Sequence, residues 1–318
     1  MNPRIAAVAL VLADLSLAQS PKVVRLEVII NNMVSYKVDV ADPLTLALQP
    51  GPVPAPDPLH TFEEFIGIGD IVSINGKPVK GIWTNRGIQT NFTPNPAPGQ
   101  AVANGTSANH SECAWDIYTE EGKYICRLTD RGLVDHAITG GGGAYLGARG
   151  EHQNGPAGIN PPLRRASAKE DPSMRRTLGG GTWQAYIYLI PTYIPEIEVT
   201  SAGPSIFHTD YSPVTASKPA ARGEALILRA RGLGPTSPGP MPPGLKVFGT
   251  NPYDDVNSPV QVVVNGTEQE SLNSIGWPGE TDVYWVSFRV PNSIAPGPAT
   301  LQIVAAWIPG NEVKFPVQ

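Results

Sequence analysis

The sequence is poor in charge, and after its first residues it has no long hydrophobic run. Charged residues make up 16% of the 318 positions, and the formal net charge is −5. The chain therefore lacks the basic footprint that binding to nucleic acid or to an anionic membrane requires. No later apolar run reaches the length of about 18 residues that a transmembrane helix needs. We expect neither a nucleic-acid partner nor a transmembrane segment.

Several signatures of catalysis and metal binding are also missing. The sequence contains neither Gly-x-Ser-x-Gly nor His-Glu-x-x-His, which mark common hydrolases and zinc proteases. Its five histidines (60, 110, 136, 152 and 208) are spread along the chain. With no close histidine cluster and no second cysteine pair, the sequence predicts no metal site and no cofactor.

Only two cysteines are present, Cys113 and Cys126, which allows one disulfide in an exported protein. They flank a predicted hairpin that turns at residues 120–123. A two-residue turn at Glu121-Gly122 does not place the cysteines opposite each other, so a bond would need a bulge or a longer loop. The sequence leaves this disulfide open.

Proline and glycine, by contrast, are abundant. The chain has 34 Pro and 33 Gly, and proline at this level breaks long helices. Short β-branched and aromatic runs lie between Gly, Pro, Asn and Asp, as in all-β proteins. The length suits about two domains, and we place the boundary near residue 195.

The N-terminus has the pattern of an export signal. Arg4 is followed by an apolar stretch over residues 5–13, and Ser16-Leu17-Ala18 supplies small residues for cleavage. Asp14 is unusual so close to the apolar stretch, and a buried first strand is the alternative. The expected division is a signal peptide (1–18), a first domain (19–195) and a second domain (196–318), in a secreted or cell-surface protein.

A run of glycines, Gly140–Gly143, leads into Ala-Tyr-Leu-Gly-Ala-Arg-Gly. The run predicts a sharp corner followed by a strand, with Tyr145 and Arg149 on one face. A phosphate-binding loop would need Gly-Lys-Ser/Thr at its end, and Ala144-Tyr145 stands there instead. The stretch resembles the Gly-Gly-Thr-Gly-x-(Tyr/Phe)-x-x-Ala-Arg-Gly signature of the allene oxide cyclase and dirigent barrel superfamily, with Gly142 where those families carry Thr.

This resemblance covers about residues 60–190 and implies an eight-stranded antiparallel β-barrel that holds an apolar ligand. The predicted strands of the first domain run over residues 23–30, 33–40, 62–74, 79–92, 113–118, 124–130, the segment after the glycine run, and 182–190. Asn75-Gly76 signals a tight turn. Residues 43–58, 94–111 and 152–176 are predicted loops.

The second domain resembles a bacterial, acidobacterial-type extracellular immunoglobulin-like or TIG-like β-sandwich. The matching pieces are Ala230–Thr236, Val262–Gly266, Phe288–Pro291 and Ala295–Leu301. Its predicted strands run over residues 225–230, 260–264, 283–290, 299–306 and 313–317. The resemblance implies anchoring or adhesion, with contact to a cell-surface or extracellular polymer.

Four residues are the candidate ligand contacts of the barrel: Arg149, Tyr145, Asp70 and Trp183. Arg149 would orient a polar end of the ligand, while Tyr145 and Trp183 would pack on its body. The alternatives are a structural ion pair for Arg149, core packing for the two aromatic residues and a solvated outer face for Asp70. The expected function is binding of a small apolar or aromatic molecule, with or without isomerisation or coupling. The other reading is a non-enzymatic structural or adhesive protein with a filled barrel.

Overall fold

The computed structural model describes residues 22–39, 62–92, 106–132, 135–159, 164–167, 170–171, 173–238, 244–269 and 271–318. Among these residues the fold is all-β, as predicted, and the one helix is α1 (Met174–Thr177). No described helix is long and apolar enough to cross a membrane. The predicted signal peptide and the predicted loop 43–58 lie outside the described residues.

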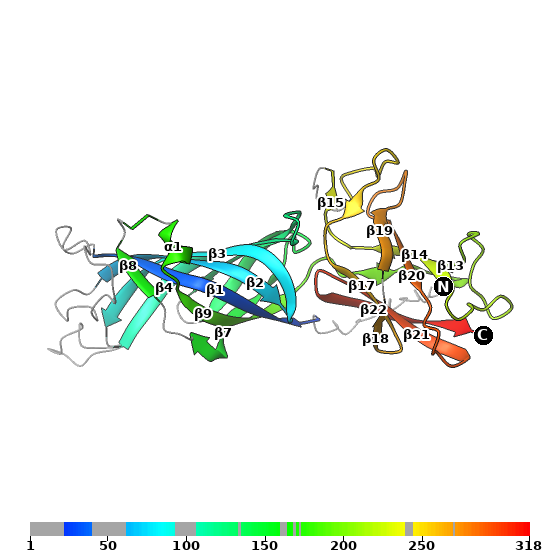
Figure 1. Ribbon diagram of the computed structural model, residues 1–318, viewed down its shortest axis with the longest axis horizontal. Coiled ribbons are helices and arrows are strands. Elements are labelled where there is room, and N and C mark those ends of the chain that lie inside the picture. Colours follow the sequence, from blue (N-terminus) through cyan, green and yellow to red (C-terminus); the bar gives the residue numbers. More distant parts are fainter. Residues whose placement is uncertain are drawn as a thin grey trace, which may run out of the picture.

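Eight antiparallel strands close into a barrel, which confirms the predicted architecture (Figure 1). The first strand pairs with the second on one side and with the last on the other, so none of the eight leaves a free edge. The strands are β1 (Val24–Asp39), β2 (Phe62–Ile74), β3 (Lys77–Phe92), β4 (Thr106–Tyr118), β5 (Tyr124–Gly132), β6 (His136–Gly143), β7 (Arg149–Ile159) and β9 (Gly181–Ile190).

The segment between β7 and β9 is more ordered than the loop that the sequence predicts for residues 152–176. Its first residues extend β7, and β8 (Arg164–Ser167) pairs in parallel with the far half of β1. Helix α1 then packs against the outside of the barrel, where Arg175 reaches the carbonyl oxygen of Asn32. Charged side chains of this segment form ion pairs on the barrel wall. Sequence composition does not distinguish such paired side chains from charged side chains that face solvent.

The glycine run is the end of a strand rather than a corner. Residues 140–143 pair with β5 as part of β6, and the chain turns afterwards, over residues 144–147. Glycine is required here by close approach: a Cβ on Gly141 would lie 2.2 Å from the carbonyl oxygen of Tyr145, and Gly143 has φ +60°. Tyr145 is therefore in the turn and buried, whereas Arg149 begins β7 and is exposed.

Inward side chains fill the described part of the barrel. Alternate residues of each strand point inward, and most of them form a single buried cluster. Three tryptophans from β3, β4 and β9 meet near its centre: ring centroids lie 6.3 Å apart for Trp83 and Trp115, 5.2 Å for Trp83 and Trp183, and 6.0 Å for Trp115 and Trp183.

The C-terminal unit (residues 196–318) contains two larger sheets and a two-stranded one. The first sheet holds β10 (Glu196–Ile197), β13 (Ile206–Phe207), β14 (Ala225–Arg231), β15 (Thr236–Ser237), β16 (Asp255–Val256), β19 (Ser271–Gly276) and β20 (Tyr284–Arg289). The second holds β17 (Val260–Val264), β18 (Thr267–Gln269), β21 (Gly297–Ala305) and β22 (Ile308–Val317), and β11 (Val199–Thr200) pairs with β12 (Gly203–Pro204). Apolar residues of both larger sheets form one core.

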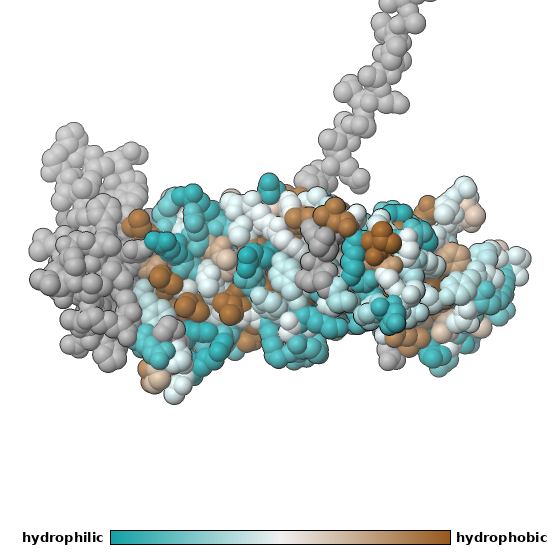
Figure 2. Space-filling view, turned by 90° about the horizontal axis from the view of Figure 1, so that it is seen from above, coloured by the Kyte–Doolittle hydropathy of each residue, from teal (hydrophilic) through white to brown (hydrophobic). Residues whose placement is uncertain are grey.

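The two units meet at one end of the barrel (Figure 1). The turn between β21 and β22, Ala306-Trp307, packs into the barrel's own buried cluster. The hydroxyl of Tyr145 donates to the carbonyl oxygen of Ala306 at 2.9 Å, and Nδ2 of Asn257 donates to that of Tyr124, also at 2.9 Å. The C-terminal unit therefore plugs this end with Trp307. Over the face seen in Figure 2, hydrophilic and hydrophobic side chains are mixed.

Candidate functional site

Four ionisable or metal-ligating side chains meet inside the barrel at one level. Cys113 of β4 lies opposite Asp130 of β5, and His136 of β6 lies opposite His152 of β7. Because side chains alternate along each strand, this register turns all four inward. Their exposed fractions are only 4%, 2%, 5% and 4%. We call these four residues the polar tier.

Asp130 is the anion of the tier. Its Oδ1 accepts a hydrogen bond from Nδ1 of His136 at 2.6 Å, and its Oδ2 accepts one from the indole nitrogen of Trp115. Burial would raise the pKa of Asp130, but the hydrogen bond from His136 and the nearby His152 ring oppose it and hold this pKa well below its usual range. Asp130 is therefore a carboxylate at neutral pH.

His136 connects this carboxylate to two further groups. Its Nε2 lies 3.2 Å from Oγ of Ser111, and the thiol of Cys113 lies 3.5 Å from its Nδ1. Since Nδ1 donates to Asp130, Nε2 is the nitrogen that accepts from Ser111 when the ring is neutral. Burial, and then the charge of Asp130, raise the pKa of Cys113 well above its usual range. The cysteine is thus a thiol in this state.

His152 differs from His136 because neither of its ring nitrogens has a hydrogen-bond partner among the described residues. Its Nδ1 lies 3.6 Å from Oδ2 of Asp130, beyond hydrogen-bond distance. Its ring packs edge-on against Trp115 and Trp183, with centroids 4.9 and 5.2 Å away. A buried polar group without a partner costs about 1–3 kcal/mol. Such a group calls for an explanation, and one explanation is that the ring binds an ion or a ligand.

The tier also has the dimensions of a metal site. One ligand atom from each of the four residues, a sulfur, a carboxylate oxygen and two imidazole nitrogens, lies within 4.8 Å of every other. Thiolate, carboxylate and imidazole are the side chains that ligate zinc and related ions. Chemically, the tier can bind a cation or exchange a proton between Asp130, His136 and Ser111.

Only one of the predicted ligand contacts reaches this tier, namely Trp183. Tyr145 is buried at the plugged end, where it binds the C-terminal unit. Arg149 is exposed, and its guanidinium donates to the carbonyl oxygens of Ala148 and Gly147 at 3.0 and 3.4 Å. The structure therefore does not bring the four predicted residues together. The position of Tyr145 is that of a core residue, whereas Arg149 contacts backbone carbonyl oxygens and not the carboxylate of the alternative ion pair.

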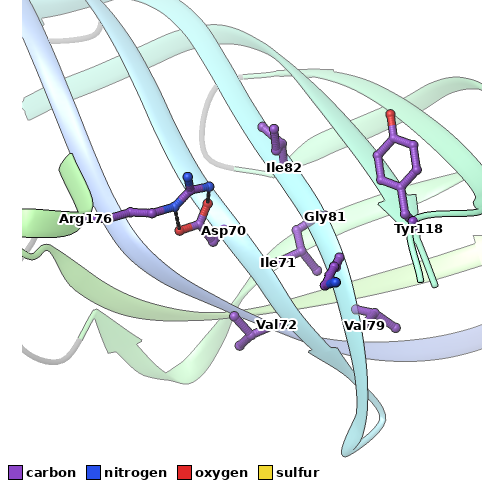
Figure 3. Close-up of a pocket in the computed structure, with 10 residues that line it drawn as sticks. Asp70, Ile71, Val72, Val79, Gly81, Ile82, Tyr118 and Arg176 are labelled. Atoms are coloured by element: carbon purple, nitrogen blue, oxygen red, sulfur yellow. Dashed lines mark hydrogen bonds and ion pairs between the residues drawn. The ribbon is translucent and has the colours of Figure 1, made fainter. Parts of the chain in front are cut away.

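Asp70 points to the outside of the barrel, where it holds the helix α1. It accepts hydrogen bonds from Arg175, Arg176 and Asn32 at 2.7–3.0 Å. Burial would raise the pKa of Asp70, but these hydrogen bonds lower it well below its usual range. The pair Asp70–Arg176 borders a shallow, largely apolar outer pocket of about 480 Å³ that Ile82 and Tyr118 also line (Figure 3).

The two cysteines are both free and buried. Cys126 pairs with Ile117 across the β4–β5 hairpin, and Ile117 lies four positions after Cys113. The disulfide that the sequence allows is therefore not formed.

The same hairpin shows why the polar tier cannot be recognised in the sequence. A turn centred on Glu121-Gly122 places Cys113 opposite Asp130, and a turn centred on Ala144 places His136 opposite His152. Register, rather than spacing along the chain, brings the four residues together, and the expectation of scattered histidines is wrong for these two.

Comparison with protein-family models, with curated proteins and with solved structures finds no match for this chain. The case for its function therefore comes from the site itself.

Proposed function

We propose that the protein is a binding protein whose barrel receives one small ligand at the polar tier. The single observation that carries the proposal is His152, a fully enclosed imidazole with two unpartnered nitrogens. The other three residues of the tier take part in hydrogen bonds, so within the tier the unused capacity lies at this one ring. The indole nitrogens of Trp83 and Trp307, in the same buried cluster, also lack a partner among the described residues. A ligand that engages His152 would remove the cost of burying it.

The surroundings of His152 limit what the ligand can be. Trp115 and Trp183 pack on the ring, and apolar side chains fill the barrel between the tier and Trp307. The ligand is therefore small, and its bonding groups face the tier. Of the contacts expected from the sequence, Trp183 stays in this proposal. The expected contacts with Arg149, Tyr145 and Asp70 do not.

Native mass spectrometry of the full chain tests this proposal. We expect the wild-type protein to carry an additional non-protein mass, and His152→Leu to lose it. His110→Leu is the matched control, because His110 lies on the same strand as Cys113 but is exposed. A wild-type chain with the mass of the polypeptide alone, unchanged by added candidate ligands, would contradict the proposal.

A second candidate function rests on Ser111. Its Oγ lies 3.2 Å from Nε2 of His136, whose Nδ1 lies 2.6 Å from Asp130, which is the order of a Ser-His-Asp triad. In an acyl transfer, Oγ would bond to the acyl carbon, its proton would pass to Nε2, and the leaving group would take that proton. Labelling of Ser111 by a fluorophosphonate would support this function. It ranks second because it gives His152 no role.

For the whole chain we propose an exported protein with an immunoglobulin-like C-terminal unit that anchors the barrel or spaces it from a surface. The Arg4 and Ser16-Leu17-Ala18 pattern supports export. The pieces Ala230–Thr236 and Phe288–Pro291 support the immunoglobulin-like unit. N-terminal sequencing of the exported protein should find a start near Gln19, and finding Met1 would contradict export by a cleaved signal. If no ligand binds the tier, the structural or adhesive function is the remaining one.

A further inference from the structure

We propose that the ligand of the polar tier is a divalent transition-metal ion, with Zn²⁺ as the first candidate, bound by Cys113, Asp130, His136 and His152. This inference rests on the proposed binding function and specifies its ligand.

The donor set selects the class of ion. A sulfur ligand and two imidazoles favour zinc and its neighbours over magnesium and calcium, which prefer oxygen ligands. One cysteine, one carboxylate and two histidines also make up the four ligands of a tetrahedral site. The four residues come from four consecutive strands of a closed barrel, so the scaffold holds them in fixed directions.

The distances fit a small ion after a limited adjustment. Ligands at about 2.0–2.3 Å from zinc stand about 3.5 Å apart at the corners of a tetrahedron. The thiol of Cys113 is 3.5 Å from Nδ1 of His136, and Nδ1 of His152 is 3.6 Å from Oδ2 of Asp130. Nδ1 of His136 is 2.6 Å from the other carboxylate oxygen, Oδ1; this is a hydrogen-bond distance, and it has to lengthen when an ion replaces the shared proton. The ligand atoms of the tier, one from each residue, all lie within 4.8 Å of one another.

The charges of the site also balance. A thiolate and a carboxylate together neutralise a divalent ion, while both imidazoles bind in their neutral form. The resulting site has no net charge, as an interior position enclosed by tryptophans requires. A monovalent ion would leave an uncompensated negative charge there.

The protons can be followed through the binding step. The ion forms bonds to Sγ, a carboxylate oxygen and two imidazole nitrogens, and the thiol proton of Cys113 leaves to solvent. The proton on Nδ1 of His136 moves to Nε2, which then donates to Oγ of Ser111. Trp115 continues to donate to Oδ2 of Asp130. Ser111 and Trp115 thus act as positioning residues that orient two of the ligands.

The experiment measures metal content and cobalt spectra on the full chain, purified without chelator and with any histidine tag removed. Plasma mass spectrometry should find about one transition-metal ion per chain. After removal of the metal, added Co²⁺ should give a thiolate-to-cobalt charge-transfer band and the visible bands of a tetrahedral ion.

Two variants and one control complete the test. Cys113→Ser should abolish the charge-transfer band, and His152→Gln should weaken Co²⁺ binding by more than about 100-fold, while His110→Gln should bind as the wild type does. Circular dichroism of each metal-free variant confirms that it is folded. A folded wild-type chain that contains no metal and gives no cobalt bands overturns the inference, as does unchanged binding in both variants. If native mass spectrometry then finds an organic molecule at the tier, the binding function stands without the metal; if it finds nothing, both fall.

Discussion

Two histidines of one tier have opposite effects on the unligated protein. His136 is hydrogen-bonded to Asp130 and lies beside Ser111, whereas the ring nitrogens of His152 have no partner among the described residues. His136 stabilises the buried carboxylate of Asp130 by a hydrogen bond. His152 also favours this carboxylate, from 3.6 Å away, but burying its two nitrogens without hydrogen bonds costs free energy. Functional sites often cost a protein some stability. A buried residue that lowers stability and lies among ligating groups is consistent with such a site.

We therefore expect His152→Leu to stabilise the chelator-treated protein. Replacing an unpartnered imidazole by an apolar side chain should raise the free energy of unfolding by about 1–3 kcal/mol, as measured in urea. His136→Leu is the comparison: it leaves Oδ1 of Asp130 without its hydrogen bond from Nδ1 of His136 and should lower the same quantity. Equal losses in both variants would mean that His152 is an ordinary packing residue.

At the scale of elements, one carboxylate fixes the helix α1 to the barrel. Asp70 on β2 receives both Arg175 and Arg176, and Arg164 on β8 pairs with Glu170 at the start of the same segment. Arg175 is buried, so the ion pair is shielded from water on one side and is more than a surface contact.

The pKa of Asp70 predicts a specific dependence on pH. Its folded pKa is below the unfolded value of about 3.9, so its stabilising effect is complete above that value and is lost as the pH falls toward the folded pKa. Asp70→Asn should lower the free energy of unfolding by about 1–3 kcal/mol at pH 7, and the difference from wild type should shrink below about pH 4. A difference that stays constant down to pH 2 would refute this assignment.

A second element, the β21–β22 turn, belongs to the C-terminal unit but packs into the core of the barrel. Trp307 belongs to the barrel's buried cluster and is 8% exposed. Trp307→Ala should lower the free energy of unfolding of the barrel by about 3–5 kcal/mol. Trp285→Ala, on the C-terminal unit and only partly buried, should cost clearly less. If the two variants melt alike by near-ultraviolet circular dichroism, the plug has no special role.

Local signals in the sequence predict most strands but not their convergence. Asn75-Gly76 turns where expected, with φ +49° and +74°, and most strands match their β-branched runs because alternation is a property of neighbouring residues. The tier depends instead on the register of several strand pairs in the closed barrel. The position of Trp307 in the barrel core results from the contact between the two units. Neither can be recognised from residue types within one segment.

At the scale of the whole molecule, the two units have separate cores joined at one shared place. The C-terminal unit has a buried cluster of its own, whereas the cluster of the barrel includes residues of both units. We therefore expect their dependence to be unequal, with the stability of the barrel relying on the C-terminal unit more than the reverse.

This asymmetry predicts how fragments behave. Residues 196–318 alone should unfold in one cooperative thermal transition, as the sequence also predicts. Residues 19–195 alone should melt at a lower temperature than the same barrel in the full chain, because their open end exposes apolar side chains. A barrel fragment with an unchanged melting temperature would show that the contact adds nothing.

The pairing of β1 with β9 also determines when the barrel can close during synthesis of the chain. Val24 pairs with Leu189, so the first strand of the barrel completes its pairing with the last one, β9. Bringing such distant partners together is slow, and until it happens the nascent chain carries two open sheet edges that favour association between molecules. A polypeptide that ends before Gly181 never reaches closure, and we expect it to be recovered as aggregate rather than as a smaller folded protein.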